Sequence, residues 1–178
     1  MGRVSLLGQS GGQSGQGIGD ELLQTASYAA PKESYMSPRT RNWLTAYIVT
    51  AMIFAVLDVA WILLVANPLY QSQIGGLLAP KANLPGAVLF YVIFVAGMVH
   101  YGVRPNHPDL ATRQRVGGAA LFGFFTYATW ALTGFAVLKD FTALVAVTDI
   151  LWGAAACSLV TWISATILRR RIMKPAAA

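Results

Sequence analysis

The chain has 178 residues, of which 56% are hydrophobic and 11% are charged, and its mean hydropathy is +0.54. Soluble domains carry about 25% charged residues, so this composition excludes an ordinary soluble domain and predicts an integral membrane protein. The net charge of +6 comes from basic residues placed just outside the apolar runs. No basic patch with interleaved aromatic residues is present in the sequence, and we expect no nucleic-acid partner.

The first 35 residues differ in composition from the rest of the chain. Residues 8–19 are almost entirely Gly, Ser and Gln, with no apolar periodicity. Such a stretch cannot bury enough apolar surface to repay the entropy of ordering, so residues 1–35 are predicted to be a disordered tail. Met36 opens a stretch typical of the start of a membrane protein, which makes it an alternative start. The membrane domain is expected over residues 36–178.

Four apolar runs follow and predict membrane spans at about residues 43–66, 84–103, 117–138 and 141–168. The first run has 24 residues and one charge. At about 1.5 Å per residue it crosses a ~30 Å hydrocarbon core with some tilt. The predicted fold is therefore all-α, a four-helix transmembrane bundle behind the disordered tail.

The connection between the first two spans has two interpretations. Pro68 and Pro80 bracket it, and Gly75 and Gly76 would weaken a helix there. An ordinary loop fits this composition. A short helix lying in the membrane interface fits it equally, because Tyr70, Ile74 and Leu77 would share one apolar face.

Small residues mark where the later spans can approach closely. Ala119 and Gly123 form a small-x-x-x-small pair in the third span, and residues 153–157 form a small run in the fourth. Cys157 belongs to that run and is expected to be a packing residue. The histidines, His100 and His107, form no metal-binding motif, and we expect neither a metal nor another cofactor.

The distribution of positive charge predicts the orientation of the spans. If both termini and the loop at 104–115 lie on one side, that side holds eleven basic residues and the other holds two, Lys81 and Lys139. The eleven are Arg3, Lys32, Arg39, Arg41, Arg104, Arg113, Arg115, Arg169, Arg170, Arg171 and Lys174. Basic residues favour the cytoplasmic side, so we predict a multi-pass protein of the cell inner membrane with both termini in the cytoplasm.

Two matching stretches carry ionisable residues inside apolar spans. Asp58 is followed three residues later by Trp61, and Asp149 is followed three residues later by Trp152. Carboxylates are costly in hydrocarbon and usually mark function. A Trp three residues from an Asp shares its helical face and could donate its indole N–H.

Counted from the expected outer ends of the four spans, their polar residues fall at about one depth. Polar side chains in a bundle turn inward, because lipid offers them no partner. We therefore predict an outward-opening pocket between the helices. Its candidate residues are Asp58, Trp61, Tyr91, Tyr127, Thr129, Thr133, Asp149 and Trp152. If the two carboxylates meet there, we expect the pair to retain at least one proton and to titrate as a unit.

The order of these elements resembles a known family. The matching elements are Asp58-x-x-Trp61, Tyr70, Ile74-Gly75, Leu89-Phe-Tyr91, Tyr127-Ala-Thr129, Leu132-Thr133 and Asp149-x-x-Trp152-Gly153. Over residues 40–168 they resemble the bacterial inner-membrane family catalogued as domain of unknown function 2177. The resemblance implies a compact four-helix membrane protein with no established activity. The third span departs from the family pattern, because Trp130, Ala131 and Gly134 stand where relatives commonly have Tyr, Asp and Asn.

Three classes of function remain open from the residues. The first is a structural or interaction protein in which the aspartates join helices. The second is a small transporter or a binding protein for a lipid, quinone or metabolite. The third is a catalyst of lipid modification or an accessory to one, although no nucleophile–base set or nucleotide loop specifies an enzyme. The lipid bilayer is the expected partner, and a homodimer or another membrane protein stays open.

Overall fold

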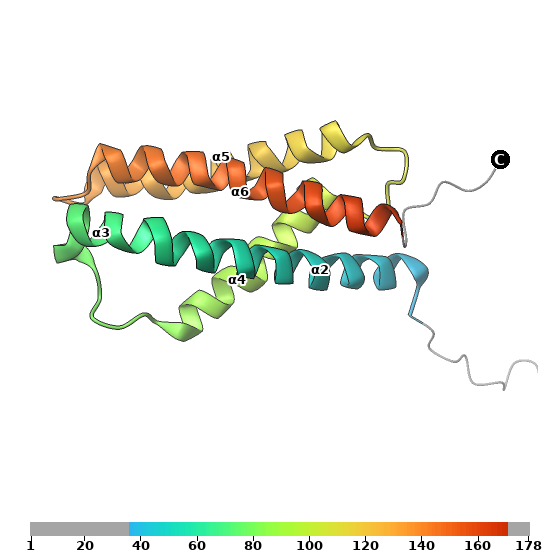
Figure 1. Cartoon of the computed structure of the whole chain (residues 1–178), viewed down its shortest axis with the longest axis horizontal. Coiled ribbons are helices and arrows are strands. Elements are labelled where there is room, and N and C mark those ends of the chain that lie inside the picture. Colours follow the sequence, from blue (N-terminus) through green and yellow to red (C-terminus); the bar gives the residue numbers. More distant parts are fainter. Residues whose placement is uncertain (1–35, 171–178) are drawn as a thin grey trace, which may run out of the picture. The chain divides into compact units, whose positions relative to one another are not determined.

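The computed structural model describes residues 36–170, which contain helices and no strand (Figure 1). The elements in chain order are α2 (Pro38–Trp61), the π-helical turn η1 (Ile62–Ala66), α3 (Asn67–Ile74), the 3-10 turn η2 (Gly75–Leu77), α4 (Leu84–Met98), the π-helical turn η3 (Val99–Val103), α5 (Thr112–Val137) and α6 (Ala143–Arg169). Four helical runs in this part are long and apolar enough to cross a membrane, which confirms the predicted fold class. The predicted tail, residues 1–35, lies outside the described residues.

Local sequence signals account for the helix starts. Ser37 caps α2 by accepting a hydrogen bond from the Thr40 N–H (3.2 Å), and Pro38 follows in the first turn, where a missing N–H costs nothing. Asn83 caps α4 in the same way through the Gly86 N–H (3.2 Å). Thr142 caps α6 through the Val145 N–H (3.4 Å).

The first helical run is longer than the span expected at 43–66, because it continues through Asn67 and Pro68 to Leu77. Residues 67–77 are therefore helical, and the loop interpretation of this segment is wrong. The π-helical turn explains the continuation. The Asn67 N–H donates to the Ile62 carbonyl five residues back, so the turn is widened immediately before Pro68, which has no N–H to donate.

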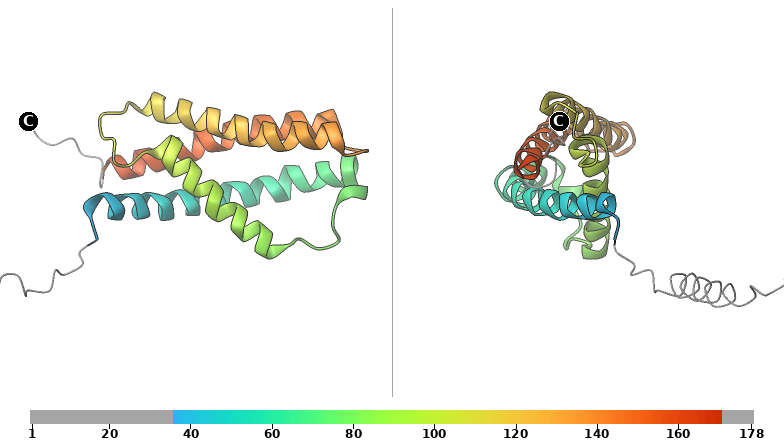
Figure 2. Two further views of the ribbon diagram at one scale, coloured as in Figure 1. Left: turned by 180° about the vertical axis from the view of Figure 1, so that it is seen from behind. Right: turned by 90° about the vertical axis from the view of Figure 1, so that its right-hand side faces the viewer.

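Helices α5 and α6 pack closely along their lengths, whereas α4 crosses the other helices obliquely (Figure 2). A Cβ atom built on Gly123 would lie 2.0 Å from the Gly153 carbonyl oxygen, and one built on Gly153 would lie 2.4 Å from the Tyr127 ring. The backbones can meet here only because both residues are glycine. Ala119 and Cys157 are fully buried beside this crossing, in agreement with their expected packing roles.

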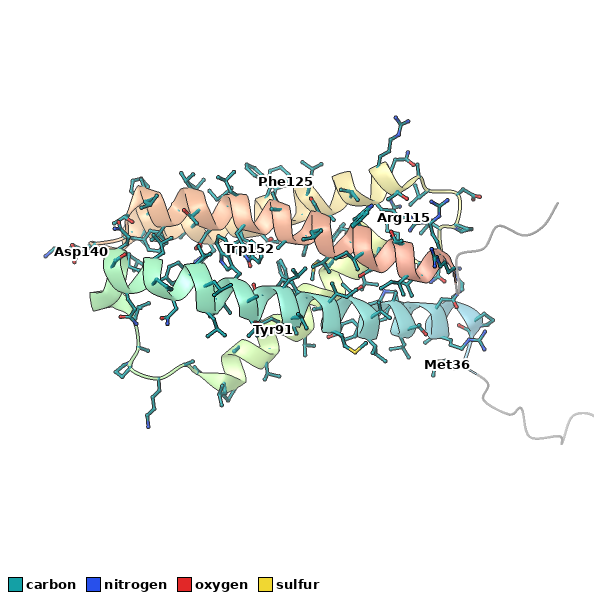
Figure 3. The ribbon with its side chains drawn as sticks, in the orientation of Figure 1. Met36, Tyr91, Arg115, Phe125, Asp140 and Trp152 are labelled. Atoms are coloured by element: carbon teal, nitrogen blue, oxygen red, sulfur yellow. The ribbon has the colours of Figure 1, made fainter. Side chains whose placement is uncertain are left out.

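The two ends of the bundle have different connections. Arg115 and Asp140 lie at opposite ends, with Trp152 between them (Figure 3). Arg115 is 1% exposed, and its guanidinium donates to the carbonyls of Val103, Arg104, His107 and Leu110. This one side chain therefore closes the connection between η3 and α5, where Arg104 has a left-handed φ of 47°.

The outward faces of the helices are apolar. Val56 is 73% exposed, Leu64 is 76% exposed and Val137 is 72% exposed. In water such a surface would be unstable, but in a bilayer it contacts lipid tails. The polar side chains that are buried include Asp58 and Asp149, which point to the interior of the helix assembly.

Candidate functional site

Asp58 lies at the middle of the first helical run and is 5% exposed. Its Oδ2 accepts a hydrogen bond from the Tyr91 hydroxyl of α4 (2.5 Å), and its Oδ1 accepts one from the Trp152 indole N–H of α6 (3.2 Å). One carboxylate therefore joins three helices. Both donors are neutral, so they satisfy the carboxylate oxygens without balancing a charge.

Asp149 lies in the second turn of α6 and is 2% exposed. The Tyr70 hydroxyl of α3 lies 2.6 Å from its Oδ1 and 2.7 Å from its Oδ2. Tyr70 can reach this site because the first helical run continues past Pro68. The long side chain of a helical residue leans toward the N-terminus of its helix, which here carries the hydroxyl back into the bundle.

A cavity of about 510 Å³ contains both carboxylates in its wall. The ring planes of Trp61 and Trp152 stack in this wall with centroids 4.2 Å apart and an interplanar angle of 4°. The complete lining is Asp58, Trp61, Ile62, Ala66, Asn67, Tyr70, Gln71, Leu78, Ala79, Ala82, Tyr127, Asp149 and Trp152. We call this space the head cavity. Polar side chains and two flat aromatic faces therefore border the same volume.

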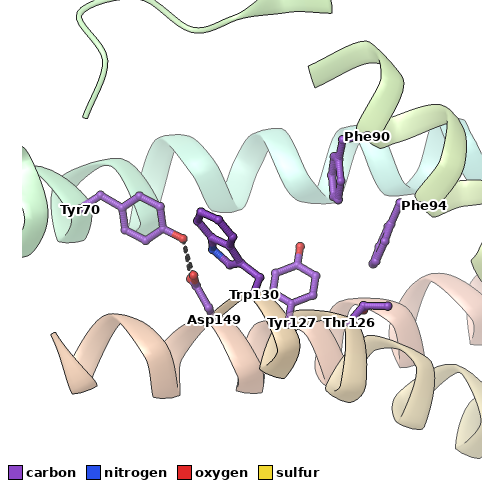
Figure 4. Close-up of a pocket in the computed structure, with 7 residues that line it drawn as sticks. All are labelled: Tyr70, Phe90, Phe94, Thr126, Tyr127, Trp130 and Asp149. Atoms are coloured by element: carbon purple, nitrogen blue, oxygen red, sulfur yellow. Dashed lines mark hydrogen bonds between the residues drawn. The ribbon is translucent and has the colours of Figure 1, made fainter. Parts of the chain in front are cut away.

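A second cavity of about 470 Å³ adjoins the first and is more apolar in its lining. Tyr70, Tyr127 and Asp149 border both spaces. Figure 4 shows Tyr70 and Asp149 at one end of this second cavity and the rings of Phe90 and Phe94 at the other. Thr126 and Trp130 complete the lining. We call this space the tail cavity.

Most of the site residues predicted from the sequence come together here. Five of them line the head cavity: Asp58, Trp61, Tyr127, Asp149 and Trp152. Tyr91 lines neither cavity, but its hydroxyl donates a hydrogen bond to Asp58, which does line the head cavity. Thr129 and Thr133 lie on the exposed face of α5 and line neither cavity. The Thr129 hydroxyl instead donates to the Phe125 carbonyl one turn back (2.7 Å).

The pairing of the two Asp-x-x-Trp stretches differs from the simplest expectation. Trp152 donates to Asp58 on the other helix rather than to Asp149 on its own helix. The sequence predicts equal depth for the two carboxylates from a first span that ends at Ala66, but the helix continues to Leu77. The carboxylates nevertheless line one cavity, and the hydrogen bonds from Tyr70 to Asp149 and from Trp152 to Asp58 both join the first helical run to α6.

Sequence reasoning missed several contributors to the site, among them Tyr70, Gln71, Phe90, Phe94 and Trp130. Tyr70 and Gln71 were expected in the connection between spans, and Trp130 was not among the candidate residues of the pocket. The signal for Tyr70 in the sequence was its place in the family motif. Ala131, at the position where relatives commonly have Asp, is fully buried against the α6 core.

The charge balance of the site is unusual. Among residues 36–170, no Lys, Arg or His lines either cavity, so the two carboxylates face no basic side chain there. The same part of the chain holds no group of three His, Cys, Asp or Glu side chains suited to a metal ion. The arrangement can hold a proton or an organic cation, and it can accept hydrogen bonds from a ligand.

The fold and the site together define a multi-pass α-helical membrane protein with a carboxylate-lined cavity. Comparison with family models gives the more specific assignment. The chain belongs to the family described as "Predicted membrane protein (DUF2177)", whose model matches residues 43–166. No curated protein and no solved structure matches the chain.

Proposed function

We propose that this protein binds a small membrane-soluble molecule between its helices, with Asp58 and Asp149 as the polar end of the binding site. The observation that supports this proposal is the pair of adjoining cavities, which share Tyr70, Tyr127 and Asp149 in their walls. Ligand sites are commonly cavities of about 300–1,000 Å³, lined by aromatic groups with a few convergent polar ones. The two cavities have volumes of about 470 and 510 Å³ and this kind of lining.

The proposal includes a location and an orientation. We infer a multi-pass protein of the cell inner membrane with cytoplasmic termini, because Arg104, Arg113 and Arg115 lie at the connection opposite the one that holds Lys139 and Asp140. In this orientation the head cavity lies toward the outer side, since Leu78, Ala79 and Ala82 of the outer connection line it. The proposed partners are lipid and a second copy or another membrane protein, and not nucleic acid.

A ligand screen with cavity-blocking variants tests the proposal. The full chain in phosphatidylcholine nanodiscs would be heated with a panel of cationic, neutral and anionic membrane-soluble compounds, and the unfolding temperature recorded. We expect saturable stabilisation by at least one class of compound. The variant Ala82→Trp should abolish it, because Ala82 is an exposed residue in the wall of the head cavity.

Ala136→Trp is the matched control for this screen. Ala136 is also exposed, but it lies on α5 outside both cavities, so this variant should retain the stabilisation. If no class stabilises the wild-type protein saturably, or if both variants respond as the wild type does, the cavities are not a binding site.

A structural role for the carboxylates is the second candidate function. It is favoured by the hydrogen bonds themselves, since Asp58 joins α2 to α4 and α6 while Asp149 joins α6 to α3. On this view the protein is a helical-bundle structural or interaction protein whose carboxylates hold helices together. Replacement of either Asp by Asn would then lower the free energy of unfolding without changing the response to any ligand.

A further inference from the structure

The proposed function leaves the chemical class of the ligand open, and the linings of the two cavities narrow it. We propose that the ligand is an amphiphile with a cationic ammonium head, which occupies the head cavity, and a hydrocarbon tail, which occupies the tail cavity. This inference rests on the proposed function.

The charge of the head cavity is the first argument. Asp58 and Asp149 line one space, and no basic side chain among the described residues borders it. Their carboxylate oxygens already accept hydrogen bonds from Tyr70, Tyr91 and Trp152, all of which are neutral donors. What the pair lacks is therefore positive charge rather than hydrogen bonds. An ammonium group supplies that charge, whereas an anionic head would be repelled by the carboxylate that is ionised.

The aromatic faces of the head cavity are the second argument. Trp61 and Trp152 stack with centroids 4.2 Å apart, and Tyr70 and Tyr127 border the same space. Indole and phenol rings attract cations over their faces, and aromatic walls are the usual recognition device for alkylated ammonium groups. A bare metal ion would instead need several oxygen ligands, and the described residues hold no group of three His, Cys, Asp or Glu side chains suited to one.

The tail cavity gives the third argument. Phe90 and Phe94 of α4 form its far end, and Tyr70 and Asp149 lie at the end shared with the head cavity (Figure 4). A ligand whose charge sits beside Asp149 can therefore extend an apolar chain toward these rings without leaving either cavity. The Tyr70–Asp149 hydrogen bond lies at the junction between the head and the tail of such a molecule.

Equilibrium binding of four probes to the full chain in phosphatidylcholine nanodiscs tests this inference. The probes are decyltrimethylammonium, decyl sulfate, decanol and tetramethylammonium. We expect decyltrimethylammonium to bind saturably and decyl sulfate not to bind. Decanol, corrected for its partition into the bilayer, should bind at least tenfold more weakly than the cation.

Variants separate the two ends of the ligand, and each is compared with the wild type in the same bilayer. Asp149→Asn should weaken the binding of decyltrimethylammonium at least tenfold and leave the binding of decanol unchanged. Asp140→Asn is the matched control, because Asp140 is an exposed acidic residue outside both cavities, and it should change nothing. Phe90→Trp should weaken the binding of decyltrimethylammonium severalfold, and it should leave the binding of tetramethylammonium, which has no tail, unchanged.

If Asp149→Asn fails to fold, Trp61→Leu replaces it in the test. Trp61→Leu should weaken the binding of decyltrimethylammonium severalfold and leave the binding of decanol unchanged. A different result would be that decanol or decyl sulfate binds saturably and as tightly as decyltrimethylammonium, with Ala82→Trp abolishing this binding. That result would contradict the proposed ammonium head of the ligand but would support the proposed binding function. Binding of the cation that is indifferent to Asp149→Asn and Trp61→Leu would also contradict the ammonium head. If no probe binds to the folded protein, the inference fails, and the wider screen with Ala82→Trp decides the binding function separately.

Discussion

At the scale of single residues, the site is held by hydrogen bonds between side chains on different helices. Asp58 accepts from Tyr91 on α4 at 2.5 Å and from Trp152 on α6 at 3.2 Å. In a bilayer no water can replace the hydrogen-bond donor of a buried carboxylate, so the loss of a donor leaves a carboxylate oxygen unsatisfied. Measured values for such interhelical bonds are nevertheless modest, because the alternative states also find partners.

We therefore predict that Tyr91→Phe lowers the free energy of unfolding by about 1 kcal/mol, since it removes one donor from Asp58 and keeps the ring. Reversible unfolding in bicelles, followed by steric trapping, would measure the change. Tyr101→Phe is the matched control. The Tyr101 side chain is 56% exposed and makes no side-chain hydrogen bond within residues 36–170, so its change should be near zero. Equal losses in the two variants would contradict the role assigned to Tyr91.

The sequence predicted many residues of this site, but it did not predict which tryptophan donates to which aspartate. Asp58 and Asp149 stood out because carboxylates are rare in apolar runs, and a Trp one turn away from each was expected on the same face. A sequence cannot show which helix a tryptophan faces, and Trp152 crosses to Asp58. Thr129 and Thr133 were predicted in the pocket from polarity alone, yet a threonine hydroxyl can be satisfied by its own helix, as Thr129 is.

At the scale of elements, glycine decides how closely α5 and α6 can approach. The small residues in these spans predicted a close crossing, and the structure places it at Gly123 and Gly153. The extent of the first helix was harder to predict. Pro68 and Gly75 normally end a helix, and the π-helical turn that carries the chain past Pro68 has no clear sequence signal. Tyr70 was missed from the site for that reason.

Gly123→Ala should destabilise the protein by about 2 kcal/mol, because the new methyl group would lie 2.0 Å from the Gly153 carbonyl oxygen and must push the helices apart. Gly117→Ala on the same helix is the control. A Cβ at Gly117 meets nothing within 4 Å, and alanine favours a helix over glycine by up to about 1 kcal/mol, so this variant should be neutral or stabilising. Thermal unfolding of both variants in nanodiscs would show the contrast. Similar behaviour of the two variants would mean that the helices do not cross at Gly123.

A second prediction at this scale concerns the connection that Arg115 closes. Its guanidinium donates to four carbonyls between Val103 and Leu110. Lysine keeps the charge but lacks the planar fork, so Arg115→Lys should lower the free energy of unfolding by roughly 2 kcal/mol. Amide hydrogen exchange should accelerate at His107 and Leu110, whose N–H groups bond within this turn. Arg113→Lys, at an exposed position two residues away, should leave exchange at both amides unchanged. Unchanged exchange in Arg115→Lys would show that the turn holds without the guanidinium.

At the scale of the whole molecule, composition was the most informative signal. Four apolar runs predicted four membrane-spanning helices, and the described residues contain four helical runs that fit a bilayer. Composition cannot show where the interior is hollow, because a cavity depends on how side chains from separate helices fall short of one another. The head and tail cavities therefore became visible only with the helices in place.

The last prediction is the orientation of the four spans. The connections that contain Pro80 and Lys139 should lie outside the cytoplasm and the one that contains Asn106 inside, because eleven of the 13 basic residues fall on the side of Asn106 and the termini. Alkaline phosphatase fused after Pro80 or Lys139 should be active, and fused after Asn106 it should be inactive. A fluorescent protein that matures only in the cytoplasm should give the opposite pattern at the same three sites. This second reporter controls for fusions that are poorly expressed. Phosphatase activity at Asn106, with fluorescence at Pro80, would reverse the orientation and place the opening of the head cavity on the cytoplasmic side.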